Sequence, residues 1–278
     1  MRKNMESAIA KAIQLKYQPV ALMWSDEKPA DAMQFAEGKW GCVMWLIVHA
    51  AKGKPAVADK KTFGCFGGGV GLGFGNQYKN FPGGEEGFCH FLSSGNAGRK
   101  DGMDVAEKIK PFMTKESYDN FLNGERYIKS PDKVEKFIRA LPLTEIPSTY
   151  VVLKPLSDVN FTKEEPRTII FFVNPDQLSA LTVLANYGRG DNENVIMPYA
   201  AGCQTIGIYP YRESQSKNPR AVVGLTDLSA RVYVRKQLGD PHFMTFAVPF
   251  SLYKEMEKNV PGSFLERHTW QSLLSDSK

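Results

Sequence analysis

Short apolar runs and segments with a helical repeat of apolar positions alternate through the second half of the chain. An apolar run bounded by turn-forming residues is typical of a buried strand, whereas apolar residues three and four positions apart are typical of a helix. This half therefore predicts strands at 150–153, 168–173, 195–197, 221–224 and 242–248. It predicts helices at 176–187, 228–236, 250–258 and 264–274, and a helix or turn at 201–208.

The first half contains more helical patterns than strands. Residues 7–15 form an amphipathic repeat, and residues 41–51 are apolar almost all round, so the second helix should be buried. A short apolar run after Pro19 predicts a strand at 19–24. Further helices are predicted at 28–37, 105–112, 115–122 and 132–141.

The alternation of strands and helices predicts an α/β or mixed α+β fold, in which helices on both faces cover the sheet. With 278 residues, of which 42% are hydrophobic, the chain can bury a full core. We expect a single domain over residues 1–278, which can be divided into subdomains 1–145 and 146–278.

A glycine-rich segment interrupts the first half. Residues 63–75 read FGCFGGGVGLGFG, with seven glycines in thirteen positions. Glycine at this density allows positive φ angles and close backbone approach, so the segment predicts an irregular loop near a site. The spacing does not match G-x-G-x-x-G, which argues against a dinucleotide-binding turn.

Charge and hydropathy exclude several kinds of partner. The chain carries 35 Lys and Arg against 30 Asp and Glu, and no basic block interleaved with aromatic residues, so nucleic-acid binding is not indicated. The longest apolar run, at 43–48, is far shorter than the roughly 18 residues that span a membrane. The N-terminal residues lack the apolar core of a secretory signal. We therefore expect a cytoplasmic protein without a membrane partner.

In such a compartment the four cysteines should be thiols or metal ligands. Cys42, Cys65 and Cys203 each follow a glycine, which leaves room beside the sulfur, whereas Cys89 lies between aromatic residues. Cys203 begins a predicted helix, where the thiol pKa should be lowered, and thiolate is the form that binds iron, zinc or haem. The alternative is that the cysteines pack as small apolar side chains, which suits Cys42 and Cys89 better than the other two.

Several motifs in fixed order resemble one known family. They are QPVAL at 18–22, Gly41 with Cys42, CFGGGVGLG at 65–73, VLKPL at 152–156, NPDQLSAL at 174–181, GCQTI at 202–206, GLTDLSAR at 224–231 and FAVP at 246–249. Over residues 17–270 the chain resembles the family called domain of unknown function 169, or ArCR, which occurs in archaea and anaerobic bacteria.

The resemblance implies a centre held by thiolates, because the family is rich in cysteine and Cys42, Cys65 and Cys203 match its cysteine positions. Many members have a further cysteine in the segment equivalent to 223–225, and this chain has none there. Three alternatives follow: Cys89 replaces it, a residue other than cysteine fills the fourth position, or the site is lost.

The first functional hypothesis is an iron–sulfur redox protein. A cluster, [4Fe–4S] by preference, would be held by Cys42, Cys65, Cys203 and Cys89. It would transfer electrons to a partner protein or reduce a small substrate. The backbone of the glycine-rich segment would donate hydrogen bonds to sulfur, and Arg231 would pair with Asp227 four residues earlier on a predicted helix. The proposed cofactor-binding residues are Gly64, Gly67, Gly68, Gly69, Gly202 and Arg231.

Two other hypotheses belong to different classes. The first is a non-catalytic module that binds haem or a small molecule in a pocket, with a cysteine or histidine as axial ligand. Its lining would be Phe63, Phe66, Phe74, Tyr78 and Phe81. The second is a structural zinc site or a thiol sensor, which ranks lowest because closely spaced cysteine pairs are missing.

Overall fold

A seven-stranded sheet forms the centre of the computed structural model, which describes residues 6–276. The strand order is β2-β3-β1-β4-β7-β6-β5, and every neighbouring pair is antiparallel except β5 and β6, which are parallel. The mixed α/β fold class is confirmed. The strands are β1 (Val20–Ser25), β2 (Ala56–Ala58), β3 (Tyr150–Pro155), β4 (Thr168–Val173), β5 (Val195–Ile196), β6 (Ala221–Gly224) and β7 (Met244–Pro249).

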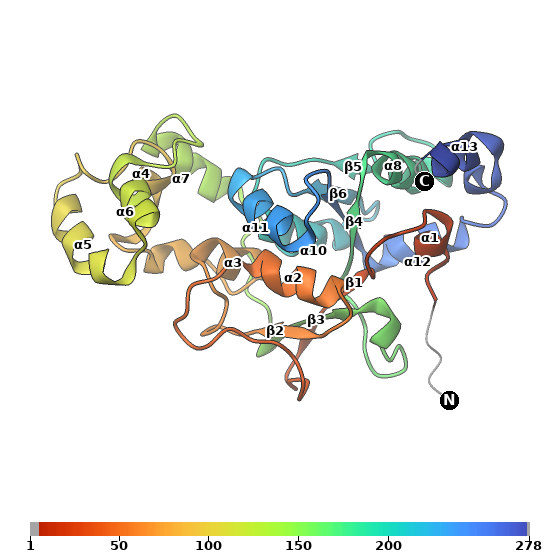
Figure 1. Ribbon diagram of the computed structural model, residues 1–278, viewed down its shortest axis with the longest axis horizontal. Helices are drawn as coiled ribbons and strands as arrows, with labels where there is room; N and C mark the ends of the chain where they lie inside the picture. Colours follow the sequence, from red (N-terminus) through yellow and green to blue (C-terminus); the bar gives the residue numbers. More distant parts are fainter. Residues whose placement is uncertain (1–5, 277–278) are drawn as a thin grey trace. The chain divides into compact units, whose positions relative to one another are not determined.

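Both faces of the sheet are covered by helices, and β4 shows why. Every residue of β4 is buried, and successive side chains point to opposite faces. Ile170 and Phe172 belong to one apolar core, and Ile169, Phe171 and Val173 belong to the other. A strand that is apolar on both sides is stable only between two layers, and Figure 1 shows helices on either side of β4.

The two layers use different parts of the chain. The first core contains residues of α2, α9 and α11, and α3 packs against α9. These helices are α2 (Val43–Ala51), α3 (Phe66–Gly71), α9 (Gly202–Ile206) and α11 (Leu228–Leu238). The opposite layer consists of α1 (Ala8–Ala12), α8 (Pro175–Tyr187), α12 (Phe250–Lys258) and α13 (His268–Asp276). The 3₁₀ turns η3 (Leu156–Asp158) and η4 (Phe264–Glu266) each contribute a leucine to the second core. Within residues 6–276, no helix has both the length and the apolar character needed to cross a membrane.

Contacts divide the chain into two units with bounds that differ from the sequence-based division. Unit 1 comprises the residues up to Phe74 and from Thr144 onward, and unit 2 is Gly75–Leu143. Phe74 and Glu145 form an antiparallel bridge, so the two points where the chain leaves and re-enters unit 1 are adjacent. Unit 2 contains η1 (Gln77–Asn80), α4 (Gly84–Leu92), α5 (Gly102–Ile109), η2 (Lys110–Phe112), α6 (Lys115–Asn123) and α7 (Pro131–Ala140).

The helix predicted over 28–37 does not form. Met33 instead forms a parallel bridge with Ala56, its N–H donates to the carbonyl of Pro55, and its own carbonyl accepts from Val57. These bonds extend the edge of the sheet beside β2. The prediction was wrong because pairing with a segment distant in sequence satisfies the same backbone groups that a helix would use.

The glycine-rich segment is also more regular than predicted, since residues 66–71 form the short helix α3. A helix with four glycines in six residues has poor intrinsic stability, by about 1 kcal/mol per glycine relative to alanine. Its first turn is capped by Cys65, whose sulfur accepts the N–H of Gly68 at 3.2 Å. Close packing against α9 supplies the rest of its stabilisation.

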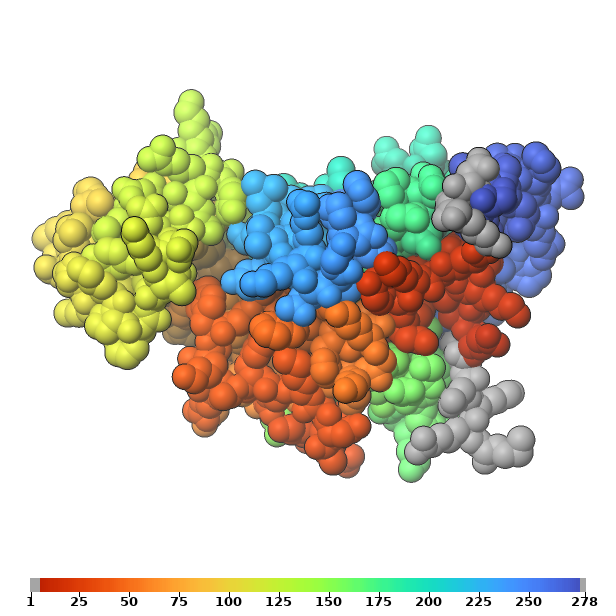
Figure 2. All heavy atoms as spheres, in the orientation of Figure 1, coloured from red at the N-terminus to blue at the C-terminus, as the bar shows by residue number. Residues whose placement is uncertain are grey.

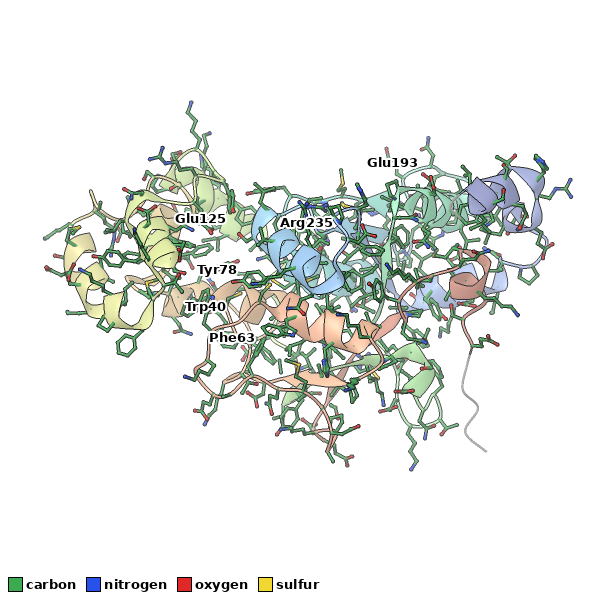
Figure 3. All side chains as sticks on the ribbon, viewed as in Figure 1. Trp40, Phe63, Tyr78, Glu125, Glu193 and Arg235 are labelled. Carbon is green, nitrogen blue, oxygen red and sulfur yellow. The ribbon has the colours of Figure 1, made fainter. Side chains whose placement is uncertain are left out.

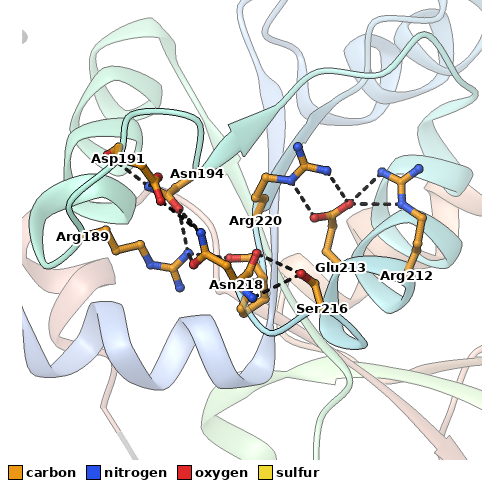
Figure 4. A network of polar contacts seen from close by, with 9 residues as sticks. Arg189, Asp191, Asn194, Arg212, Glu213, Ser216, Asn218 and Arg220 are labelled. Carbon is orange, nitrogen blue, oxygen red and sulfur yellow. Dashed lines mark hydrogen bonds and ion pairs between the residues drawn. The ribbon is translucent and has the colours of Figure 1, made fainter.

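Two arginines pair with the buried Glu213 in the segment that leads into β6 (Figure 4). Glu213, on α10 (Ile208–Ser214), accepts hydrogen bonds from Arg212 and from Arg220, with Arg220 Nε at 2.8 Å. Burial alone would raise the pKa of Glu213, but the hydrogen bonds from Arg220 and Arg212 outweigh it and the net pKa is lowered. This carboxylate is therefore charged and paired, which fixes the path of the chain after α10.

Candidate metal centre

The starts of three helices carry the three cysteines that follow a glycine. Cys42 is the N-cap residue of α2, Cys65 is the N-cap residue of α3, and Cys203 is the second residue of α9. Free backbone N–H groups at a helix start give it a partial positive charge. Each thiol is thus placed where backbone donors can reach its sulfur.

The starts of α2 and α3 lie against one another. A Cβ atom on Gly64 would lie 2.3 Å from the carbonyl oxygen of Gly41, and Gly64 has a φ of +74°. A Cβ atom on Gly68 would lie 2.4 Å from Cγ2 of Val43. Only glycine allows backbones to approach this closely. Gly41 and Gly64 precede Cys42 and Cys65, so these contacts bring the first two thiols together.

Helix α3 makes an equally close contact with α9. A Cβ atom on Gly71 would lie 2.6 Å from the carbonyl carbon of Cys203. The thiol of Cys203 donates a hydrogen bond to the carbonyl oxygen of Gly67 at 3.0 Å. Gly67 lies in the first turn of α3, two residues after Cys65, so the third thiol joins the first two.

Asp227, the N-cap residue of α11, completes this group. Its Oδ2 accepts the N–H of Ala230 at 3.1 Å, which caps the helix. Its Oδ1 is buried and makes no hydrogen bond of good geometry, although the N–H of Gly202 is near enough to lower the pKa of Asp227. Asp227 raises the pKa of Cys42, Cys65 and Cys203 alike through its charge, so the carboxylate lies close to all three thiols.

Arg231 bonds to backbone carbonyl oxygens, whereas a pair with Asp227 was predicted. Its guanidinium donates to the carbonyl oxygens of Leu225, Pro241 and Phe243, at 2.7–3.2 Å. These bonds tie α11 to the residues on either side of it in the chain. Burial raises the pKa of Asp227 and the charge of Arg231 opposes that rise, but the described residues show no salt bridge between the two side chains.

Burial keeps the three thiols protonated. Burial makes the largest contribution to the pKa of Cys42, which is raised to about 12, and a negative charge at Cys65 makes the next largest. Burial also raises the pKa of Cys65, and it raises that of Cys203 well above its ordinary value. The predicted lowering at Cys203 was wrong because burial outweighs the helix N-terminus. Thiols that oppose one another's ionisation become thiolates together when a cation lies among them.

The donor set of the centre is rich in sulfur. In residues 6–276, no three side chains of histidine, cysteine, aspartate or glutamate form a group that could hold one metal ion. Tetrahedral zinc, with sulfur at about 2.3 Å, needs sulfurs roughly 3.8 Å apart. A four-iron cluster has its ligands on different irons, so its sulfurs stand further apart. Three thiols, with the N–H of Gly68 directed at one sulfur, have the chemistry of cluster ligands.

The other glycines predicted at the site lie in its framework. Gly69 is buried in α3, and its N–H donates to the carbonyl of Cys65. Gly202 begins α9 next to Asp227. Cys89 belongs to unit 2, where it lies on α4. Burial raises its pKa to about 11, followed by the charges of Glu85 and other acids of that unit.

The aromatic residues of the glycine-rich segment pack against one another. The ring of Phe63 lies 6.5 Å from Phe66 and 6.4 Å from Phe74, and Phe66 in turn contacts Trp40 at 6.0 Å. Figure 3 labels Phe63 and Trp40 in this region. These contacts form an aromatic cluster.

Two hollows in unit 1 bear on the haem alternative. The larger, of about 230 Å³, is lined by residues of α11 together with Pro241 and Phe243. It is smaller than the roughly 300–1,000 Å³ of ordinary ligand pockets. The other is lined by Trp24, Tyr211 and their neighbours. No cysteine is among the residues that line these two hollows.

The surface next to the centre is partly apolar. Helices α2 and α11 pack against each other, and Figure 2 shows them side by side in orange and blue. Trp45 is 40% exposed on α2, and Leu228 and Val232 are 62% and 64% exposed on α11. Trp45 follows Cys42 by three residues, and Leu228 follows Asp227 directly. The centre therefore lies close beneath this surface.

Sequence reasoning singled out the three cysteines but did not place Asp227 beside them. The only local signal is its place in GLTDLSAR at 224–231, where an aspartate precedes a helical pattern and predicts a helix cap. Asp227 was assigned only to a pair with Arg231. Its nearness to the thiols depends on how α9 and α11 pack, which no local pattern shows.

Comparison with known proteins gives one match. The profile of the family described as uncharacterised ArCR, DUF169, matches residues 8–259. No curated protein and no solved structure matches the chain.

Proposed function

Since the chain belongs to the DUF169 family of uncharacterised ArCR proteins, we propose its function from the candidate metal centre itself. The protein is an iron–sulfur redox protein. Cys42, Cys65 and Cys203 hold the cluster, which is [4Fe–4S]. The protein passes electrons to a partner or uses them to reduce a small substrate.

The convergence of the three thiols is the observation that carries this proposal. They come from positions up to 161 residues apart in sequence, yet Cys65 and Cys42 both act through their charge on Cys203. Unrelated buried cysteines would be expected at scattered places in the core. Glycine contacts at Gly64 and Gly71 hold their helices together at separations that no other residue permits.

The surroundings of the thiols suit a negatively charged cluster. When bound, such a cluster supplies one-electron oxidation and reduction. The helix starts direct N–H groups at its sulfurs, which stabilises the reduced form. The core beneath α2 and α9 excludes water from one side, while the nearby surface formed by α2 and α11 allows close approach of an electron donor or acceptor.

We also propose the cytoplasm as its compartment. All four cysteines are free thiols. Thiols persist in a reducing compartment, whereas an oxidising one would favour disulfides between neighbouring cysteines such as these.

The test is to purify the full chain without oxygen and to measure iron, acid-labile sulfide and visible absorption. We expect about four irons and four sulfides per chain, with absorption that bleaches on reduction. Alanine variants of Cys42, Cys65 and Cys203 should each lose most of the iron. Circular dichroism checks that each variant remains folded, because Cys65→Ala also removes the cap of α3 and Cys203→Ala the donor to Gly67.

Cys89→Ala is the matched control, since it removes a buried thiol from unit 2 and should retain the iron. A wild-type protein that stays free of iron and sulfide, even after reconstitution with both, would refute the cluster. So would a Cys203→Ala protein that keeps the full wild-type iron content.

A further inference from the structure

We propose that the carboxylate of Asp227 is the fourth ligand of the centre, so that one iron is held by oxygen and three by sulfur. This inference rests on the proposed cluster. It assigns the fourth position of the centre to the start of α11.

The position of Asp227 is the first argument. The start of α11 meets the start of α9, because a Cβ atom on Gly202 would lie 3.1 Å from Oδ1 of Asp227 and 3.2 Å from Cβ of Ala230. Gly202 precedes Cys203 in the chain. The carboxylate is therefore placed beside the third thiol, and its charge acts on all three thiols.

The unpaired oxygen is the second argument. Oδ2 has a partner in the N–H of Ala230, whereas Oδ1 is buried and lacks a well-formed hydrogen bond. A buried carboxylate oxygen without a well-formed hydrogen bond destabilises the fold. Coordination to iron would supply that partner without disturbing the helix cap, because Oδ2 caps the helix and Oδ1 would bind the iron.

Met44 and Cys89 are the competing ligands. A Cβ atom on Gly202 would lie 3.3 Å from the sulfur of Met44, so its thioether also borders the centre. A neutral thioether neither pairs with iron(III) as strongly as a carboxylate nor explains the unpaired oxygen. Cys89 lies in unit 2, and the charged groups that act on it are Glu85, Glu86 and Glu135 of that unit.

One consequence distinguishes an oxygen ligand from a fourth thiolate. A carboxylate holds iron within a sulfide cluster less firmly than a thiolate does, so this iron should leave first on oxidation. With ferricyanide as the one-electron acceptor, the [4Fe–4S]²⁺ core releases one Fe²⁺ and gives up one electron. The product is a [3Fe–4S]⁺ core held by the three cysteines, and ferricyanide becomes ferrocyanide.

The experiment titrates the anaerobic full-length protein with ferricyanide and measures iron content and electron paramagnetic resonance. We expect the wild type to fall from about four irons to about three per chain, with the signal of a three-iron cluster. Asp227→Cys, which supplies a fourth thiolate, should keep about four irons under the same treatment. Asp227→Asn should hold only about three irons before any oxidant is added.

Folding is controlled by the choice of variants. Asparagine is as good an N-cap as aspartate, so Asp227→Asn should keep the unfolding midpoint of the wild type. Met44→Leu, which conserves volume, and Cys89→Ala should both respond to ferricyanide as the wild type does.

The outcomes separate this inference from the proposed function. A wild type without iron refutes both. If the wild type and Asp227→Asn both contain four irons and both keep all four after ferricyanide, the proposed cluster stands. The assignment of Asp227 as a ligand is then overturned. Loss of the fourth iron in Met44→Leu or Cys89→Ala, with Asp227→Asn unchanged, assigns the position to that residue instead.

Discussion

Burial decides the chemistry of single residues more than their position in a helix does. Cys203 lies at a helix start, a place that lowers a thiol pKa, yet its pKa is raised because it is only 6% exposed and adjoins two other thiols. Glu213 is also buried, but two arginines reverse the effect of burial and lower its pKa. The partners within reach thus determine whether a buried group carries charge.

At the residue scale we predict that Glu213→Gln weakens the fold in a way that depends on pH. Near pH 7 the free energy of unfolding should fall by roughly 1–3 kcal/mol, because charged hydrogen bonds to Arg212 and Arg220 are lost. The folded pKa is lowered, so this stabilisation is present above the unfolded pKa of about 4.3 and is lost as the pH falls through the folded value.

Denaturant unfolding at several pH values measures the effect. The difference between wild type and Glu213→Gln should shrink below about pH 4. Glu145→Gln is the matched control, because Glu145 pairs with Lys60 at the exposed surface and the change should have little effect at any pH. An equal loss in both variants, or a difference that does not vary with pH, would contradict the argument.

At the scale of elements, glycine sets how closely the helices of the centre approach. Helix α3 is built from residues that form helices poorly, and it is stabilised by its cap at Cys65 and its contact with α9. The segment 28–37 shows the converse, since a helical pattern there yields to pairing beside β2. In both places, contacts between elements outweigh local propensity.

We predict that Gly71→Ala forces α3 and α9 apart. The new Cβ atom would lie 2.6–2.8 Å from backbone atoms of Cys203 and Gln204, which cannot rotate away. Overpacking of this kind costs about 1–3 kcal/mol. The iron content should fall as well, because Cys65 and Cys203 separate.

Thermal unfolding and iron analysis test this pair of effects. Gly190→Ala is the control, since no atom lies within 4 Å of its new Cβ and its φ is not positive. It should match the wild type in both measurements. Full stability and full iron content in Gly71→Ala would show that the contact at Gly71 does not hold the centre together.

At the scale of the whole molecule, the chain forms one unit with the sheet and a second unit inserted into it. The three thiols and Asp227 all belong to unit 1, on one side of the sheet, and Cys89 belongs to unit 2. The insertion leaves and returns at adjacent points, because Phe74 and Glu145 are bridged.

We predict that unit 1 folds and holds its cluster without unit 2. A chain in which a short glycine–serine linker joins Phe74 to Thr144 should keep the far-ultraviolet spectrum of a mixed fold and about four irons. The adjacent ends make the join possible without strain. Iron analysis and circular dichroism measure the result. A shortened chain that is folded but lacks iron would show that unit 2 contributes to the centre.

The sequence by itself determined the elements whose pattern is local and the residues capable of chemistry. The strand at 168–173 and the helices at 115–122 and 228–236 could be predicted because apolar spacing within a few residues reflects which side of an element is buried. The cysteines and the family were also evident from the sequence. The tertiary structure decided which residues meet. The approach of Cys42, Cys65, Cys203 and Asp227, and the direction of their pKa shifts, depend on the packing of helices distant in sequence, and local patterns carry no information about that packing.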